Sequence, residues 1–221
     1  LQRVPNGDWI AAIAPPHPYR CPPGPYARVP MMAHALKSSG RTQARIVILD
    51  PKEKFSKQPL FQAGWQAHYP GMIEWMPPMI HAGVTRVDPG TMSVETGFES
   101  YRNVALVNVI PRQTAGQIAR DAGLAGTNGF CPVDPFTMKS EMDDAVFVLG
   151  DAAIAGDMPK AACAANSQAV VVARVIAAEL LEREQPRIMY RNKCWSLIGT
   201  DASVFVSGTY KPTSEKIKQV A

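Results

Sequence analysis

The feature that most constrains the fold is a strand, a helix and a second strand in succession near the N-terminus. Residues 8–14 predict a short apolar strand that two prolines end, and residues 26–38 predict a helix with Gly40 as its stop signal. Residues 45–50 form a β-branched apolar run that ends in an acid, which is the profile of a buried parallel strand. These segments together predict one βαβ unit.

The rest of the chain continues the alternation of strands and helices. The segments 85–87 and 92–96, joined by Asp88-Pro89-Gly90, predict a β-hairpin. The other predicted elements are strands at 104–110, 145–149 and 203–209 and helices at 115–122 and 160–183. Buried apolar strands that alternate with helices predict the α/β class.

The composition is that of a globular chain and argues against several functions. Of the 221 residues, 46% are hydrophobic and 19% are charged, which allows a sizeable core and argues against disorder. The net charge is +4, but Lys and Arg are scattered, so nucleic-acid binding has little support. The longest apolar stretch, residues 161–181, is interrupted by polar residues and predicts a buried helix in place of a membrane span.

The turn at Gly150-Asp151 is the first candidate site. It follows the predicted strand 145–149, so its carboxylate is expected at the carboxyl end of a sheet, where open α/β sheets bind ligands. Glycine lets a ligand approach the backbone closely, and Asp151 can accept a hydrogen bond from a sugar-like hydroxyl. The helix that begins near Lys160 can present amides to an electron-rich ring or a phosphate. On spacing alone, an ordinary turn with a capping Asp remains an alternative.

A proline-dense loop, residues 15–26, forms the strand-to-helix turn of the βαβ unit. Nucleotide-binding units carry G-x-G-x-x-G at this turn, and here prolines stand in place of the glycines, which predicts that the unit binds no NAD. The prolines would instead hold Cys21 rigidly, as a redox thiol must be held beside its acceptor. A buried structural cysteine is the alternative.

The four cysteines show no C-x-x-C spacing, which disfavours zinc and thioredoxin-type sites. Cys194 follows Arg191 and Lys193, whose charge would favour a thiolate, and a tail cysteine beside surface charges is the alternative. Cys131 and Cys163 are interpreted as structural. The histidines lack metal-ligand spacing, so no metal site is predicted.

Several stretches carry a family resemblance: PPHPYRCPPGPYARV (15–29), VILDPKEKFSKQPLFQAGW (47–65), NVIPRQTAGQIA (108–119), GFCPVDPFTM (129–138), VFVLGDAAIAGDMPKAACAANSQA (146–169) and YRNKCWSLI (190–198). Together they resemble the flavoprotein subunit of flavocytochrome c sulfide dehydrogenase, a family of the pyridine nucleotide-disulfide oxidoreductase superfamily. The likeness runs almost end to end, and its Cys-Pro-Pro-Gly-Pro-Tyr and Gly-Asp-Ala motifs are specific.

The resemblance implies a chemistry and a set of site residues. The cysteines that match Cys21 and Cys194 form a redox-active disulfide in that family, which hydrosulfide attacks before two electrons pass to FAD. Electrons then leave to a c-type cytochrome subunit, and the expected location is the periplasm. The segment that resembles the family's second FAD contact region contains Gly150, Asp151, Met158, Pro159 and Lys160.

Two departures from the family pattern bear on function. The family commonly has an acidic residue after the Cys-Pro-Pro-Gly-Pro-Tyr run, considered a catalytic acid or base, and this chain has Ala27. The family's N-terminal βαβ unit with its glycine-rich fingerprint does not precede the chain, and Ala221 comes before the family's C-terminal flavin-covering segment. We therefore expect a C-terminal fragment with half of an FAD site, inactive alone.

The resemblance also implies a domain organisation. Residues 1–104 are expected to form a Rossmann-like, NAD-domain-like unit without a nucleotide fingerprint, residues 105–185 the second part of an FAD-binding domain, and residues 186–221 the start of a C-terminal α+β interface domain. Two alternatives to the sulfide dehydrogenase remain: a non-catalytic docking module of the same fold, and a quinone-reducing relative. The lack of an amphipathic C-terminal helix counts against the relative.

Overall fold

The computed structural model describes residues 1–220, which form two compact units. The first unit consists of Leu1–Pro18, Pro23–Arg112 and Ser196–Val204. The second consists of Tyr19–Pro22, Gln113–Trp195 and the chain from Phe205 onward. The short Tyr19–Pro22 segment, which contains Cys21, thus belongs to the second unit although the residues on both sides of it belong to the first.

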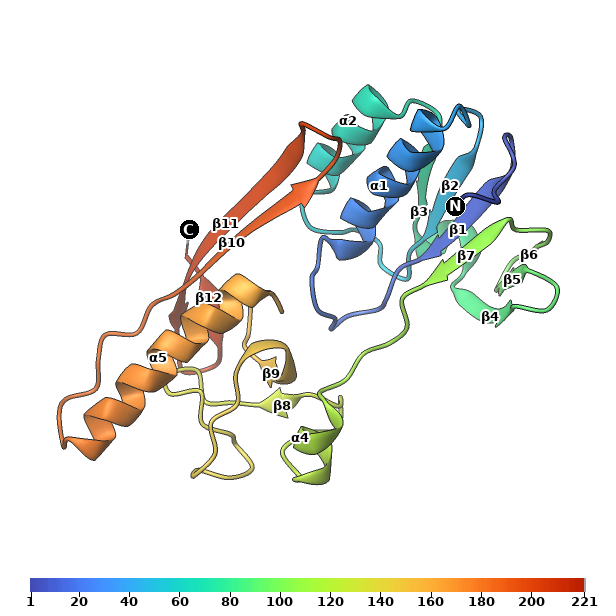
Figure 1. Ribbon diagram of the computed structural model, residues 1–221. Coiled ribbons are helices and arrows are strands. Elements are labelled where there is room, and N and C mark those ends of the chain that lie inside the picture. The colour runs from blue at the N-terminus through green and yellow to red at the C-terminus, as the bar shows by residue number, and fades with distance from the viewer. Residues whose placement is uncertain (221) are drawn as a thin grey trace. The chain divides into compact units, whose positions relative to one another are not determined.

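A four-stranded parallel sheet organises the first unit, with strand order β3-β2-β1-β7. Two helices, α1 and α2, lie side by side on one of its faces (Figure 1). The bounds are β1 Trp9–Ile13, α1 Gly24–Ser38, β2 Arg45–Leu49, α2 Gln58–His68, β3 Ile73–Met76 and β7 Leu106–Val109. The predicted βαβ unit and the α/β class are confirmed.

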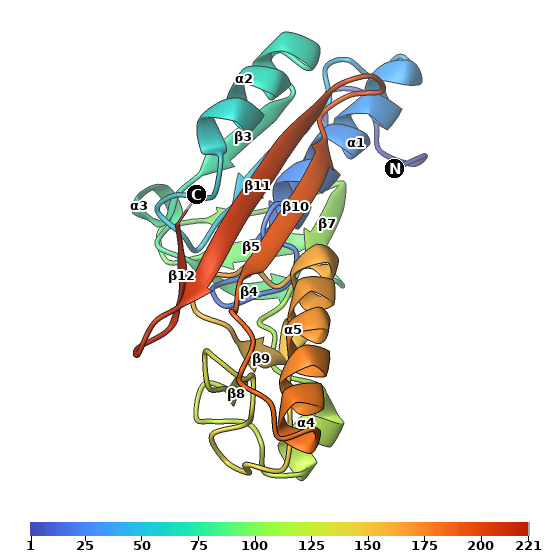
Figure 2. The ribbon, with the colours of Figure 1, turned by 90° about the vertical axis from the view of Figure 1, so that its left-hand side faces the viewer.

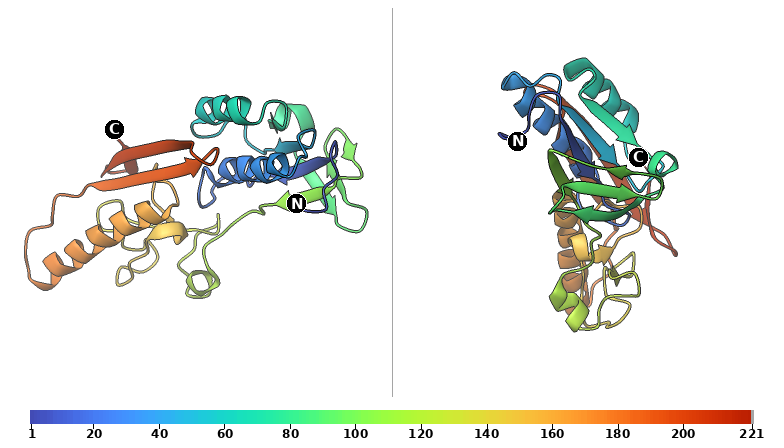
Figure 3. Two further views of the ribbon diagram at one scale, coloured as in Figure 1. Left: turned by 45° about the horizontal axis from the view of Figure 1, so that its top comes forward. Right: turned by 90° about the vertical axis from the view of Figure 1, so that its right-hand side faces the viewer.

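An antiparallel meander covers the opposite face of this sheet (Figures 1 and 3). It consists of β4 (Val84–Asp88), β5 (Ser93–Thr96) and β6 (Ser100–Tyr101), and a one-turn helix, α3 (Pro78–His81), precedes it. The predicted hairpin is therefore present. Because side chains alternate along strands, every second residue of β1 and β2 faces the meander. These residues and two from the meander side form one core: Ala11, Ile13, Val47, Leu49, Val94 and Val104.

Strand β7 differs from its prediction in burial. The apolar run 104–110 predicts a buried strand, but β7 lies at the edge of the sheet and Val109 is 46% exposed. Because β7 pairs with β1, the chain stays in the first unit as far as Arg112. The division into 1–104, 105–185 and 186–221 stays a prediction about the domains of the protein.

The second unit is built around one long helix, α5. Figure 2 shows α5 beside the small pairing of β8 and β9 and beside β10. The bounds are α4 Gln117–Asp121, β8 Cys131–Pro132, a 3₁₀ turn η1 Gly150–Ala152, β9 Ala153–Ile154, α5 Ala162–Leu180, β10 Tyr190–Leu197, β11 Ser203–Pro212 and β12 Ile217–Gln219. Strands β10, β11 and β12 form one sheet in that order.

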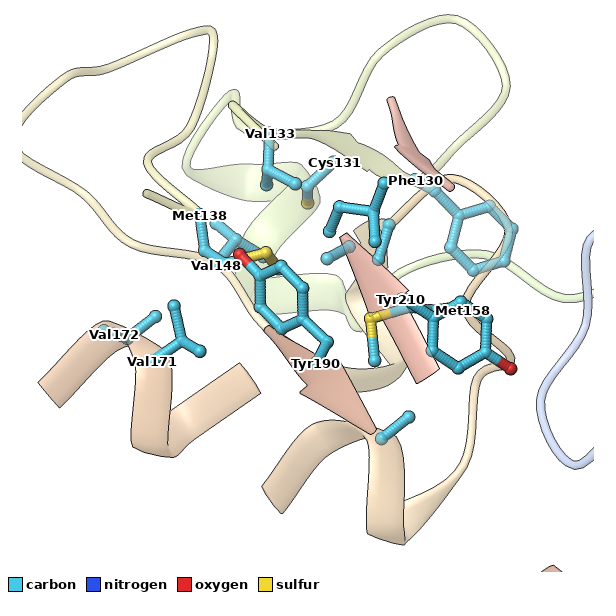
Figure 4. Packing of buried hydrophobic residues seen from close by; sticks show 14 of the residues in the cluster. Phe130, Cys131, Val133, Met138, Val148, Met158, Val171, Val172, Tyr190 and Tyr210 are labelled. Atoms are coloured by element: carbon cyan, nitrogen blue, oxygen red, sulfur yellow. The ribbon is translucent and has the colours of Figure 1, made fainter. Parts of the chain in front are cut away.

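Helix α5 is buried on one face only. By length and composition alone it is apolar enough to cross a membrane, but its inner residues pack into the core of the second unit. Val171, Val172 and Val175 lie there with Tyr190 and Tyr210 (Figure 4). The helix is therefore buried on this face, as predicted, while Val170 and Leu180 are exposed.

Two strand predictions in the second unit are corrected by the structure. Residues 145–149 form no strand, although Leu149 is extended. Among residues 1–220 they pair only with the 138–140 segment, through the isolated Lys139–Phe147 bridge and a few main-chain hydrogen bonds. That pairing is too short to make a strand. The tail contains three strands where the sequence predicts one. Strand β10 was missed because polar Asn192 and Ser196, each 3% exposed, fill its buried positions and hide the alternation.

A buried charged cluster closes the carboxyl end of β2 in the first unit. Asp50 is fully buried, and its carboxylate accepts hydrogen bonds from the Tyr26 hydroxyl at 2.5 Å and from Trp75 Nε1 at 2.9 Å. Lys52 Nζ lies 2.6 Å from the same carboxylate and also donates to the carbonyl of Pro15. Burial lowers the pKa of Lys52, and the bond to Asp50 opposes that shift. All of these groups satisfy each other within the protein.

Replacing Asp50 with Ala should destabilise the first unit strongly. The substitution leaves a buried ammonium and two buried donors without their acceptor, which costs about 3–5 kcal/mol. The matched control is Glu95→Ala, because Glu95 pairs with Arg86 at the surface, where the pair contributes less than about 1 kcal/mol. Urea unfolding followed by tryptophan fluorescence compares the two variants; equal losses would contradict this account.

Candidate functional site

The turn at Gly150 is held against helix α5 by one buried glutamine. The Gly150 amide donates to Gln168 Oε1 at 2.6 Å, and Gln168 is 1% exposed. Gln168 Nε2 contacts the sulfur of Met158 at 3.6 Å, so the same side chain ties both ends of the 150–158 segment to the helix. Gly150 has a φ of +72°, and a Cβ there would lie 3.2 Å from that of Ala165. Glycine is thus needed for both conformation and closeness.

Lys160 fixes the same turn from the other side. Its Nζ donates to the carbonyl of Asp151 at 2.9 Å and to the carbonyl of Ala153 at 2.5 Å. It also lies 4.1 Å from the centre of the Phe130 ring. Burial lowers the pKa of Lys160 to about 8, an effect that the charge of Asp151 and the neighbouring Cys131 partly oppose. Lys160 is therefore a desolvated amine whose hydrogen bonds set the path of residues 151–153.

The main chain of Lys160 holds Cys21. The Cys21 amide donates to the Lys160 carbonyl at 2.7 Å, and Arg20 and Lys160 form an isolated parallel bridge. The Arg20 amide also donates to Gln113 Oε1 at 2.9 Å. Cys21 is exposed and has a φ of 54°, a conformation uncommon for residues other than glycine. The structure therefore brings two predicted site segments together: the proline loop with Cys21, and the Gly150–Lys160 segment.

Cys194 lies on β10 in the same unit. It is partly buried, and its sulfur lies 3.9 Å from the main-chain oxygen of Trp195. Lys193 and Trp195 are exposed, as expected for strand neighbours whose side chains alternate between faces. All four cysteines are in the thiol form in the structure, so the disulfide between Cys21 and Cys194 stays a prediction.

The other predicted contact residues lie along one short stretch. Met158 is buried at 6% exposure, Pro159 is partly buried, and Asp151 is exposed. The Asp151 carboxylate accepts no hydrogen bond from residues 1–220. Helix α5 begins after Ala161 without a side-chain cap and without an acid in its first turn. An open carboxylate, a glycine that permits close approach and uncapped helix amides fit the ribityl and ring side of a flavin.

The carboxyl end of β2 in the first unit offers no comparable ligand site. In nucleotide-binding βαβ units an acid in the position of Asp50 binds the ribose hydroxyls. Here the Asp50 carboxylate already accepts bonds from Tyr26, Trp75 and Lys52, and the side chain has no exposed surface. The carboxylate is therefore not available to a ligand.

The family match places this chain, with its parallel sheet, meander and Gly-Asp turn, in the class of flavoprotein oxidoreductases. Residues 1–111 match the family model of the sulfide dehydrogenase [flavocytochrome c] flavoprotein chain, central part. Since this match covers half of the chain, the protein belongs to the flavocytochrome c sulfide dehydrogenase flavoprotein family.

Solved structures share this fold at low sequence identity. A chain of the mitochondrial ATP synthase of Tetrahymena thermophila is 19% identical with a TM-score of 0.66, over 92% of this chain and 51% of that one. A chain of the covalent putidaredoxin reductase–putidaredoxin complex is 15% identical with a TM-score of 0.52, over 94% and 48%. Our chain thus spans about half the length of both. Their different settings show that the fold alone does not define a reaction.

Sequence reasoning missed the residues that hold the site together. Gln168 could have been found as a lone glutamine at a buried position of an apolar helix. Gln113 carries no comparable signal. The bond from Cys21 to Lys160 involves only main-chain atoms, which every residue type shares, so no pattern of side chains could predict it.

Replacing Gly150 with Ala should destabilise the second unit more than the same change at Gly123. Both glycines have a positive φ, and a side chain there costs about 1–2 kcal/mol. A Cβ at Gly123 meets nothing within 4 Å, whereas at Gly150 it presses on Ala165, which adds about 1 kcal/mol. Chemical unfolding of the two variants measures the difference, and equal losses would show that Ala165 does not constrain the turn.

Lys160 should make stability rise with pH in the alkaline range. Its pKa falls from 10.5 in the unfolded chain to about 8 in the folded one because of burial. Between these values the unfolded chain binds more protons, so the free energy of unfolding increases with pH. Comparing wild type with Lys160→Met between about pH 7.5 and pH 9.5 isolates this effect. A parallel pH dependence in the two proteins would contradict a lowered pKa.

Proposed function

We propose that this chain is part of an FAD-dependent sulfide dehydrogenase that oxidises hydrosulfide through a disulfide between Cys21 and Cys194. The observation that carries the proposal is the bond from Cys21 to Lys160, which holds the thiol loop on the segment that contains Gly150 and Asp151. Membership of the flavocytochrome c sulfide dehydrogenase family supports the choice of substrate.

The chemistry begins with thiol–disulfide exchange. Hydrosulfide attacks one sulfur of the Cys21–Cys194 disulfide; a new S–S bond forms, the old one breaks, and one cysteine leaves as a thiolate while the other becomes a persulfide. FAD, when bound, supplies the acceptor for the two electrons.

The residues of this chain have distinct parts in holding FAD. The Asp151 carboxylate would accept from the ribityl hydroxyls, and Gly150 permits the close approach that this requires. Met158, Pro159 and Lys160 lead into the uncapped start of α5, whose amides would face the ring. Lys160 keeps Asp151 in place through the carbonyl bond and keeps Cys21 beside it through the main chain.

The electron acceptor and the location complete the proposal. Electrons would leave to a c-type cytochrome subunit, and the periplasm, which is oxidising, would allow the disulfide to persist. The proton usually assigned to an acidic residue cannot be handled at Ala27. A group elsewhere must serve in its place, and we propose Lys160, a partly buried amine with a pKa of about 8 that lies within the flavin-contact segment.

In the full-length protein, replacing Cys21 or Cys194 with Ser should abolish sulfide-dependent reduction of cytochrome c, by on the order of 10³-fold or more. Either change removes one sulfur of the proposed pair, whereas Cys163→Ser removes a partly buried thiol outside that pair and should leave the rate unchanged. The flavin spectrum of each variant checks that the cofactor stays bound. Unchanged turnover in Cys21→Ser would overturn the catalytic disulfide and favour a docking module.

A further inference from the structure

A positively charged groove lies between α5 and the chain that follows it. After α5 the segment 186–193 turns back and runs alongside the helix (Figures 1 and 2). The groove has a volume of about 470 Å³ and lies wholly within the second unit. Its walls are Cys163, Asn166, Ser167, Val170, Val171 and Arg174 on α5 and Pro186, Arg187, Ile188, Met189, Arg191 and Lys193 opposite. The sequence analysis and the proposed function assign no ligand to it.

Four cations line this groove, and no acidic residue does. Arg174 comes from the helix, and Arg187, Arg191 and Lys193 come from the facing segment. Throughout residues 1–220, none of these four side chains forms an ion pair or a hydrogen bond. Like charges gathered in one concave place repel each other, so an anion that enters the groove relieves that repulsion as well as gaining its own contacts.

Hydrogen bonds hold the two walls of the groove in place. The Arg191 amide donates to the Ser167 hydroxyl at 2.9 Å, which ties the start of β10 to the middle of α5. Tyr190, the neighbouring residue, is fully buried, and its hydroxyl donates to the carbonyl of Pro135 at 2.9 Å. Arg174, Arg191 and Lys193 therefore project from two anchored elements, which lowers the entropy lost when they bind a ligand.

Apolar side chains from both walls line the groove beside the cations. Val171 is buried, Val170 is 45% exposed, and Ile188 and Met189 are partly buried opposite them. Asn166 adds an amide that can donate. A volume of this size falls in the range of small-ligand pockets, roughly 300–1,000 Å³, in which apolar walls contact the body of a ligand and a few polar groups orient it.

We propose that this groove binds a small organic anion that carries at least two phosphate groups. Four cations exceed the charge of a simple carboxylate or dicarboxylate, and guanidinium groups match phosphate oxygens in bidentate geometry. The apolar side chains of the lining would contact the organic body of the ligand, so a nucleoside diphosphate should bind more tightly than inorganic pyrophosphate. This proposal does not depend on the proposed function, because neither flavin nor sulfide takes part in it.

The experiment uses Cys163, which lines the groove, as the reporter. The full chain carries Cys21→Ser and Cys194→Ser, which remove two of the four thiols. Cys131 is fully buried, so a neutral maleimide reacts with Cys163. Saturating ADP should slow this labelling about tenfold or more, pyrophosphate should protect at higher concentration, and adenosine should not protect. Raising the salt concentration should weaken the protection by ADP.

Arg191→Gln tests the assignment against a control of equal charge change. Loss of a charge-assisted contact should raise the dissociation constant for ADP by at least about tenfold. Arg120→Gln, on exposed α4 outside the groove, should leave it unchanged. Arg174→Gln repeats the test with a cation from the helix. It leaves the main-chain bond of Arg191 intact, so it serves if Arg191→Gln disturbs the strand.

Several results would overturn the proposal. They are a lack of protection by ADP at millimolar concentration, equal ADP affinity in Arg191→Gln, Arg174→Gln and Arg120→Gln, or equal protection by adenosine. Protection by poly-glutamate or by phosphatidylglycerol vesicles without protection by ADP would likewise overturn it, since the groove would then fit an acidic polypeptide or a lipid surface.

Discussion

The candidate site depends on the interactions of a single residue, Lys160. Its main-chain carbonyl accepts the Cys21 amide, while its ammonium holds the carbonyls of Asp151 and Ala153. These groups come from distant parts of the chain, so residue 160 links Cys21 to the Gly-Asp turn, through its main-chain carbonyl on one side and its ammonium on the other. A buried amine is costly unless its donors are satisfied, and here two carbonyls and the Phe130 ring satisfy them. The cost of burial appears as a lowered pKa.

The two units use the acid that follows an apolar run in opposite ways. In the first unit, Asp50 is enclosed by Tyr26, Trp75 and Lys52, so this edge of the sheet contributes to stability. In the second unit, Asp151 stays exposed, and the glycine before it leaves space for a ligand. The same fold element, an acid after an apolar run, is thus closed in one place and open in the other. Neighbouring side chains, and not the acid itself, make the difference.

Most regular elements were predictable because their signals are local. The periodicity of β1, α1, β2 and α5 and the turn chemistry at 88–90 depend on residues close in sequence. The strand predictions that failed have one cause in common: the sequence does not show which segments pair with each other. The apolar run 145–149 has strand propensity but almost no ladder partner, whereas polar residues inside β10 lie buried because β11 and the core cover them. Propensity alone cannot report which partner a segment finds.

The sequence by itself determined the α/β class, the loss of a nucleotide fingerprint at the proline loop, and the identity of Cys21, Gly150 and Asp151 as candidates. Residue type and spacing carry that information. Only the tertiary structure decided that Cys21 is held on Lys160, that Asp50 is sealed, and that four cations gather beside α5. Such contacts join residues far apart in the chain, often through main-chain groups that are alike in every residue, so the path of the folded chain sets them.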